Sequence, residues 1–376
     1  MWQKCLLVLI ISTGLGACQS NGQVSLSPDA YIHDEGFPGY DQKIIETQDE
    51  LFALNQPVVD YLQQNIMIYK DKSVRLRELV AQLFNPQKIN LLYATDANST
   101  ASETFNLHTA NCLSMSILAY AMADFVGLQS ELQDVLIPEF WDIRQGYSFI
   151  NGHVNLRVKV DANDKGVLVD FNDSFTSGRF SKTLVSKALA TTMFYNNKGA
   201  MAMIENDYTL AYRYFRQALM LAPDYIPSWS NMGVLYRISG HSDWAEEVYK
   251  AALIMDSDSL NVLDNLAILY DITKRKSDAH DIRAKIERRR QDNPYYHYYL
   301  GELAYQNRDW RQATKHYRRA IRLESKEHQF YFSLARTYSQ MGKLSATRKN
   351  LSLAKRHSDT DEQYNRYASK LTLLHH

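Results

Sequence analysis

The amino-acid sequence predicts an α+β domain followed by an all-α solenoid of helical repeats. Two observations lead to this fold class. Between residues 45 and 190, helical apolar spacing gives way to short runs of β-type residues that accompany one strongly apolar helix. From residue 192 onward, small and large residues recur with a period of 34, which is typical of stacked helix pairs.

The first domain is predicted from its local patterns in chain order. Helical spacing covers 47–54, 57–66, 73–84 and 111–125, and β-type runs cover 131–137, 153–160 and 167–171. The connection 161–166 (DANDKG) is dense in turn-forming residues. The last two strands are therefore expected to form a hairpin.

The repeats are predicted from columns of small residues. One column holds Gly199, Gly233, Ala267, Gly301 and Ala335, and a second holds Ala211, Ala245, Ala279, Ala313 and Thr347. The second copy carries Trp229, Met232, Gly233, Tyr236, Ala245 and Tyr249, and in this it resembles the tetratricopeptide repeat. Five such repeats are expected over 192–361, with a capping helix over 362–376. The resemblance implies a protein or peptide partner bound in the groove of the repeats.

The N-terminal sequence predicts that the protein is exported. Residues 1–18 contain Lys4, an apolar run over 6–11 and small residues that end at Cys18, which is typical of a signal peptide and too short to span a bilayer. Leu15, Gly16, Ala17 and Cys18 resemble the lipobox of bacterial lipoproteins. That resemblance implies a lipidated Cys18, a membrane contact through its acyl chains and, since Gln19 follows, the outer membrane facing the periplasm. The alternative is a secreted protein cleaved near Ala17. Residues 19–44 mix Ser, Gly, Pro and Asp and predict a loosely ordered tether.

Composition excludes several classes of protein. The 42 basic residues balance the 42 acidic ones, which removes the electrostatic footprint of a nucleic-acid binder. No cofactor or metal is expected: the histidines lack zinc-type spacing, and 161–166 begins like a calcium loop but has Lys165 and Asn172 at ligand positions. The run 274–290 holds eight basic and three acidic residues. It is interpreted as a solvated helix face or as a contact for acidic headgroups or an acidic partner.

Cys112 is the one thiol expected in the mature chain, because Cys5 leaves with the signal peptide and Cys18 takes the lipid. It begins the most apolar helix, where the helix N-terminus favours the thiolate. The hairpin brings His153 and Asp170 to the same end, so the carboxylate could orient the imidazole and the imidazole could activate the thiol. Two alternatives remain open: Cys112 as a core residue, and Asp173 in place of Asp170.

The order Cys, His, Asp also resembles the transglutaminase-like fold, a papain-related architecture. The resemblance is carried by 111–114 (NCLS), 152–154 (GHV) and 169–171 (VDF), and it extends to bacterial lipoproteins that join such a domain to tetratricopeptide repeats. It implies nucleophile Cys112, base His153 and orienting Asp170, acting on amide or related acyl bonds by hydrolysis or transfer. The backbone N–H of Cys112 is one candidate oxyanion donor, and a second is unassigned.

The sequence is therefore consistent with two alternative functions. The first is a membrane-anchored cysteine amidohydrolase or acyltransferase whose repeats recruit a protein substrate. The alternative is a catalytically silent repeat scaffold for protein interactions in the cell envelope. A role in peptidoglycan linkage is a third option, for which the sequence has no specific signature.

Overall fold

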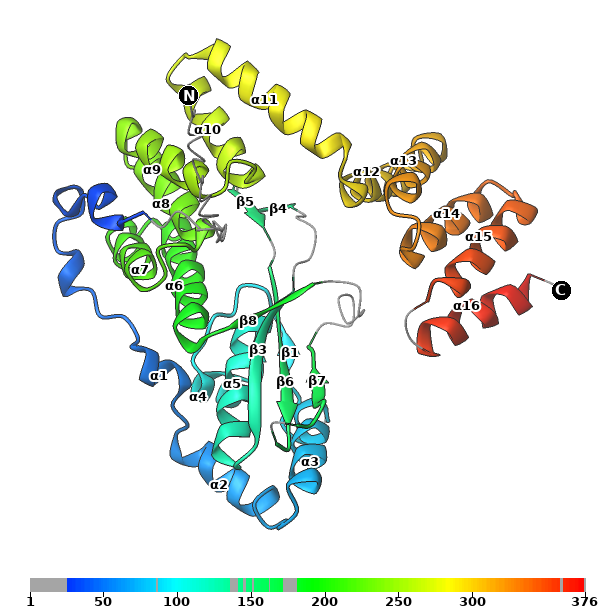
Figure 1. The fold of residues 1–376 in the computed structure, drawn as a ribbon, viewed down its shortest axis with the longest axis horizontal. Coiled ribbons are helices and arrows are strands. Elements are labelled where there is room, and N and C mark those ends of the chain that lie inside the picture. The colour runs from blue at the N-terminus through cyan, green and yellow to red at the C-terminus, as the bar shows by residue number, and fades with distance from the viewer. Residues whose placement is uncertain are drawn as a thin grey trace, which may run out of the picture.

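The structure is a computed structural model that describes residues 26–85, 87–135, 141–144, 147–150, 152–161, 163–171, 181–358 and 361–374 (Figure 1). Cys18, Asn172 and Asp173 lie outside the described residues. No helix in the described ranges is long and apolar enough to cross a bilayer.

Five helices build the first domain, and four of them were predicted. They are α1 (Gln48–Phe52), α2 (Gln56–Asn65), α3 (Lys72–Phe84), α4 (Ala101–Leu107) and α5 (Cys112–Phe125). The short α4 was not predicted. It begins with a capping box in which Thr100 and Glu103 each satisfy a backbone N–H of the other.

A four-stranded antiparallel sheet with the order β7-β6-β3-β8 covers one side of α5. Its strands are β3 (Gln129–Val135), β6 (His153–Lys159), β7 (Val167–Val169) and β8 (Lys182–Val185). The predicted hairpin of β6 and β7 is confirmed, with Leu156 opposite Val169. Two small pairs flank the sheet: β1 (Leu92–Tyr93) with β2 (Thr109–Ala110), and β4 (Trp141–Arg144) with β5 (Tyr147–Ile150).

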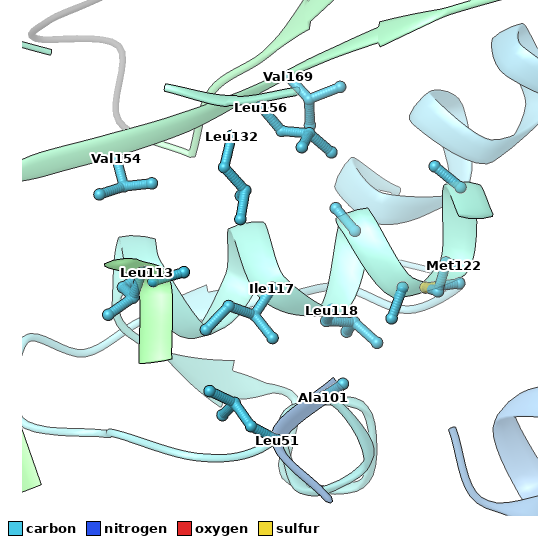
Figure 2. Close-up of a cluster of buried hydrophobic side chains, with 14 of the residues drawn as sticks. Leu51, Ala101, Leu113, Ile117, Leu118, Met122, Leu132, Val154, Leu156 and Val169 are labelled. Atoms are coloured by element: carbon cyan, nitrogen blue, oxygen red, sulfur yellow. The ribbon is translucent and has the colours of Figure 1, made fainter. Parts of the chain in front are cut away.

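The core of this domain lies on both sides of α5. Figure 2 shows Leu132, Val154, Leu156 and Val169 of the sheet above the helix, and Leu51 and Ala101 below it. Each large aliphatic side chain buried here contributes about 1.5–3 kcal/mol. Ser116 also donates a hydrogen bond to the carbonyl of Val154 at 3.2 Å. The start of α5 is therefore held beside the start of β6.

One continuous helix joins the two domains. α6 (Lys187–Ile204) places Phe194 in the core of the first domain and Met203 in the core of the repeats. The boundary predicted near residue 191 thus falls inside a helix rather than in a linker, because both halves of α6 bury an apolar face.

Within the described residues, ten further helices follow α6 (Figure 1). They are α7 (Tyr208–Leu221), α8 (Ile226–Ile238), α9 (Ser242–Met255), α10 (Leu260–Ile272), α11 (Lys276–Gln291), α12 (Pro294–Gln306), α13 (Trp310–Leu323), α14 (His328–Gln340), α15 (Leu344–Arg356) and α16 (Asp361–Leu373). The helices α6 to α15 form five consecutive pairs, and α16 packs on α15.

The glycine column has a steric cause. A Cβ on Gly233 would lie 2.3 Å from the ring of Tyr249, and one on Gly301 would lie 2.5 Å from the ring of Tyr317. The third repeat has Ala267 at this position, and its partner sixteen residues on is Arg283 instead of an aromatic residue. Glycine therefore stands where a buried ring crosses the helix.

Residues 26–44 differ from the predicted tether. They form three short 3-10 turns, η1 (Pro28–Tyr31), η2 (Asp34–Gly36) and η3 (Tyr40–Gln42), packed on α7, α8 and α9. Phe37 is buried, with its ring stacked 4.3 Å from that of Tyr212. The aromatic residues scattered among Gly and Pro supply the packing that the composition of the segment does not suggest.

Five of the eight basic residues in the run 274–290 form ion pairs within the chain. Arg275 pairs with Glu246 of α9, Arg283 with Asp271 and Arg290 with Asp264, while Lys285 and Arg289 meet Asp258. Most of the run thus makes internal ion pairs along α11.

Candidate functional site

Cys112 is the first residue of α5 and is partly buried with a free thiol. The residue before it, Asn111, caps the helix: its Oδ1 accepts the N–H of Ser114 at 2.9 Å. The Nδ2 of Asn111 donates to Oδ1 of Asn98 at 2.5 Å, and its backbone N–H donates to the carbonyl of Ala97 at 2.9 Å. These bonds fix the helix start and therefore the position of the thiol.

His153 and Asp170 lie together in the buried part of the hairpin. His153 begins β6, and Asp170 directly follows β7. The Nε2 of His153 lies 2.8 Å and 3.0 Å from the two carboxylate oxygens of Asp170. Both side chains are at most 3% exposed. The structure therefore brings together the two residues that the hairpin prediction placed at one end.

The thiol of Cys112 reaches the same imidazole. Burial by itself lowers the pKa of His153, but hydrogen bonds to Asp170 and to Cys112, with the charges of both groups, raise it to about 9. At neutral pH the imidazole is thus held as a cation between a carboxylate and a sulfur. This is the arrangement that a thiolate–imidazolium pair requires.

Asn155 belongs to this cluster and was not predicted. Its Nδ2 donates to Oδ2 of Asp170 at 2.9 Å, and its side chain is fully buried. The register that pairs Leu156 with Val169 sets Asn155 opposite Asp170. The sequence holds one signal for this residue: Asn155 lies two residues after His153, and alternate residues of a strand share a face, so its side chain is expected on the same side as the imidazole.

Asp134 is a second carboxyl group near the imidazole. Burial raises the pKa of Asp134, and the positive charge of His153 opposes that rise. It lies on β3 opposite Val154, the neighbour of His153.

Two backbone N–H groups lie beside the thiol at the start of α5. The first N–H groups of a helix have no acceptor within the helix. Asn111 accepts that of Ser114, whereas those of Cys112 and Leu113 make no hydrogen bond to a described residue. Leu113 therefore supplies the second candidate oxyanion donor that the sequence left unassigned.

His108 lies four residues before Cys112 but does not join the cluster. His108 bonds through Nδ1 to the carbonyl of Ile89 at 2.6 Å, outside this cluster. The described ranges contain no group of three or more His, Cys, Asp or Glu residues placed to hold a metal ion.

Comparisons with known proteins concern the repeats. Residues 194–225 and 294–326 each match a family model described as tetratricopeptide repeat. These segments are the first and fourth predicted repeats, so the presence of tetratricopeptide repeats is confirmed. Neither match reaches residues 45–190, where the transglutaminase-like resemblance stays a prediction. No curated protein matches the chain.

Several solved structures are similar to about half of the chain. One, from a functional characterisation of Pseudomonas aeruginosa pilF, is 16% identical over 50% of this chain and 94% of that chain, with a TM-score of 0.27. The MamA protein is 20% identical over 46% of this chain and 95% of that chain, with a TM-score of 0.25. YrrB, described as a TPR protein with an unusual peptide-binding site, is 13% identical over 48% of this chain and 92% of that chain, with a TM-score of 0.25.

Proposed function

We propose that this chain is a protein-interaction scaffold whose repeats bind a protein or peptide partner. The observation that carries the proposal is the tetratricopeptide repeat itself, matched at both 194–225 and 294–326. Repeats of this family bind protein and peptide partners through the surface that stacking creates.

A row of amides along the first helices of three repeats offers a binding surface for a peptide backbone. Asn231 of α8 donates to Asn196 of α6 at 2.9 Å. Asn265 of α10 donates to Ser230 at 3.2 Å and to Asn261 at 3.0 Å. Amide side chains can both donate to and accept from a peptide backbone, which suits an extended partner.

Site-specific photocrosslinking in the native host tests the scaffold. A photoreactive phenylalanine at Asn231 is expected to give discrete adducts with a protein partner, and the same residue at the exposed Arg288 of α11 is the matched control. The same adducts at both positions, or adducts at neither, would contradict binding along the amide row.

A second function, thiol chemistry, is favoured by the cluster in the first domain. We infer that Cys112, His153 and Asp170 act as nucleophile, base and orienting residue of a transglutaminase-like cysteine amidohydrolase or acyltransferase. The observation that supports it is one imidazole bonded to a carboxylate at 2.8 Å and to a thiol at the start of a helix.

The chemistry would proceed through a thioester. The Cys112 thiolate attacks the amide carbonyl, and the N–H groups of Cys112 and Leu113 stabilise the oxyanion. His153 gives its proton to the leaving amine, the C–N bond breaks and a thioester remains. His153 then takes a proton from water or from an acceptor amine as that molecule attacks the thioester. The C–S bond breaks, the acid or new amide leaves, and the Cys112 thiolate and the His153 imidazolium are restored.

Acyl transfer from casein glutamines to a fluorescent primary amine, together with release of ammonia, measures both outcomes of this chemistry. Cys112→Ala is expected to abolish turnover and leave partner binding intact. Full activity in the Cys112→Ala protein would rule out the thiol mechanism.

We also propose that lipid on Cys18 anchors the chain in the bacterial envelope, at the outer membrane facing the periplasm. The support is the lipobox resemblance of 15–18 and the residue Gln19. Metabolic labelling with an alkyne fatty acid should mark the wild-type protein but not Cys18→Ala. Equal labelling of both would contradict the proposal.

A further inference from the structure

We propose that a cationic groove on the fourth and fifth repeats binds an acidic segment of a partner protein. The groove has a volume of about 930 Å³ and is lined by residues of α13, by Tyr338 of α14 and by the turn that follows α14. Five of its lining residues are cations: Arg311, Lys315, Arg318, Arg322 and Lys343. Asp309 is the one carboxylate among the described lining residues, and it caps α13 by accepting the N–H of Gln312.

The charges of this groove are not neutralised within the described chain. None of the five cations forms an ion pair with a described residue, whereas Arg275, Arg283 and Arg290 of the α11 run all do. Four of the five lie along α13 at spacings of three or four residues and so form one stripe of the helix. Unpaired like charges around a concave surface create a positive potential that attracts anions.

In the first two repeats, the surface at the equivalent repeat positions is covered by the chain's own residues 31–40. Arg318 and Tyr338 lie three repeat periods after Arg216 and Tyr236. On this covered surface, Nε of Arg216 donates to Asp34 at 2.9 Å, and the hydroxyl of Tyr236 donates to the carbonyl of Tyr31 at 3.0 Å. A segment that contains Asp34 and Glu35 and forms short 3-10 turns therefore occupies this position in the first two repeats.

The residues that differ between this covered surface and the cationic groove indicate a different occupant. Tyr212 and Trp244, which stack on Phe37 and His33, correspond to Thr314 and Ala346 in the later repeats. Loss of these rings removes the contacts that select the chain's own segment. Met220 and His241 correspond to Arg322 and Lys343, which adds positive charge. The cationic groove thus favours a more acidic and less aromatic segment, supplied by another protein rather than by a second copy.

Fluorescence anisotropy with the full-length chain tests the proposal. The probe is a labelled peptide of residues 34–41 (DEGFPGYD) that carries the changes Phe37→Ser and Tyr40→Ser and is extended by two glutamates at each end. We expect saturable binding that the joint change Arg318→Gln and Arg322→Gln weakens at least tenfold. Since Arg318 also donates to Tyr338 at 2.5 Å, Lys315→Gln with Arg322→Gln is a second variant that leaves this contact in place.

Arg216→Gln is the matched control, because it makes the same change at the same repeat position on the covered surface. It is expected to leave probe binding within twofold of the wild type. Binding that depends on Arg216 instead of Arg318, or equal binding of the probe with Asn and Gln in place of Asp and Glu, would overturn the proposal.

Two further outcomes would also overturn it. An Arg318-dependent dimer of the chain alone, measured by light scattering, would assign the groove to a second copy. Arg318-dependent binding to vesicles rich in phosphatidylglycerol, with no binding of the peptide, would assign it to a membrane surface.

Discussion

Replacing Asp170 by Asn removes the carboxylate that holds the imidazole of His153. The structure places this carboxylate 2.8 Å and 3.0 Å from Nε2 of His153, with both side chains buried. An amide of the same shape keeps the packing and loses the charge. Burial, which lowers the pKa of His153, is then opposed by the interaction with Cys112 and by the charge of Asp134. We expect the pKa of His153 to fall from about 9 toward its ordinary value of 6.5.

The effect of Asp170→Asn on stability follows from the linkage between protonation of His153 and folding. A rise in pKa from 6.5 to about 9 corresponds to about 3 kcal/mol of stabilisation of the folded protein by the imidazolium. Because the pKa is raised on folding, this contribution is complete below pH 6.5 and is lost as the pH rises through about 9. Wild-type protein should therefore lose stability across this pH range, and Asp170→Asn should lose much less.

NMR titration of the His153 ring, assigned by comparison with His153→Ala, measures the pKa directly. Urea unfolding at pH 6 and pH 9.5 measures the change in stability. If His153 of the Asp170→Asn protein still titrated near pH 9, the carboxylate would not be the group that holds the cation, and the reasoning would be refuted.

Two further predictions concern packing. Gly233→Ala should destabilise the repeats by about 1–3 kcal/mol, because the new Cβ would lie 2.3 Å from the buried ring of Tyr249. Thermal or urea unfolding measures this change. An unchanged stability would mean that the ring can move aside. Phe37→Ala should reduce the local stability of residues 26–45 by about 3–5 kcal/mol and make this segment sensitive to limited proteolysis. Ile44→Ala, at an exposed position, should change neither the stability nor the sensitivity. Equal sensitivity of the two variants would contradict the packing of this segment.

Local pattern was enough to predict the hairpin and every described helix of the first domain except α4. The apolar spacing of 111–125 and the turn residues of 161–166 are signals within one element, and the structure has α5 and the β6–β7 hairpin at these places. The proximity of His153 and Asp170 could be predicted from the hairpin alone, because the turn that joins two antiparallel strands determines which strand ends lie together.

Contacts distant in sequence could not be predicted in this way. Phe37 and Tyr212 stack across 175 positions of chain, and the composition around Phe37 is typical of a loop. The hydrogen bond from Asn155 to Asp170 could not be predicted, because it depends on the register of β6 and β7. β8 has only four residues, too few for alternation to distinguish a strand from a loop.

The central claim of the thiol proposal is that Cys112 and His153 form a reactive pair. The most direct measurement is the rate of Cys112 alkylation by iodoacetamide across pH 5 to 10 in the full-length chain, compared with His153→Ala. Rapid labelling at pH 6 to 7, where an ordinary thiol with a pKa of about 8.5 reacts slowly, is predicted for the wild type. The His153→Ala protein should label at least tenfold more slowly in that range. Identical profiles for the two proteins, or labelling only on unfolding, would contradict the claim and leave Cys112 as a structural residue of a scaffold.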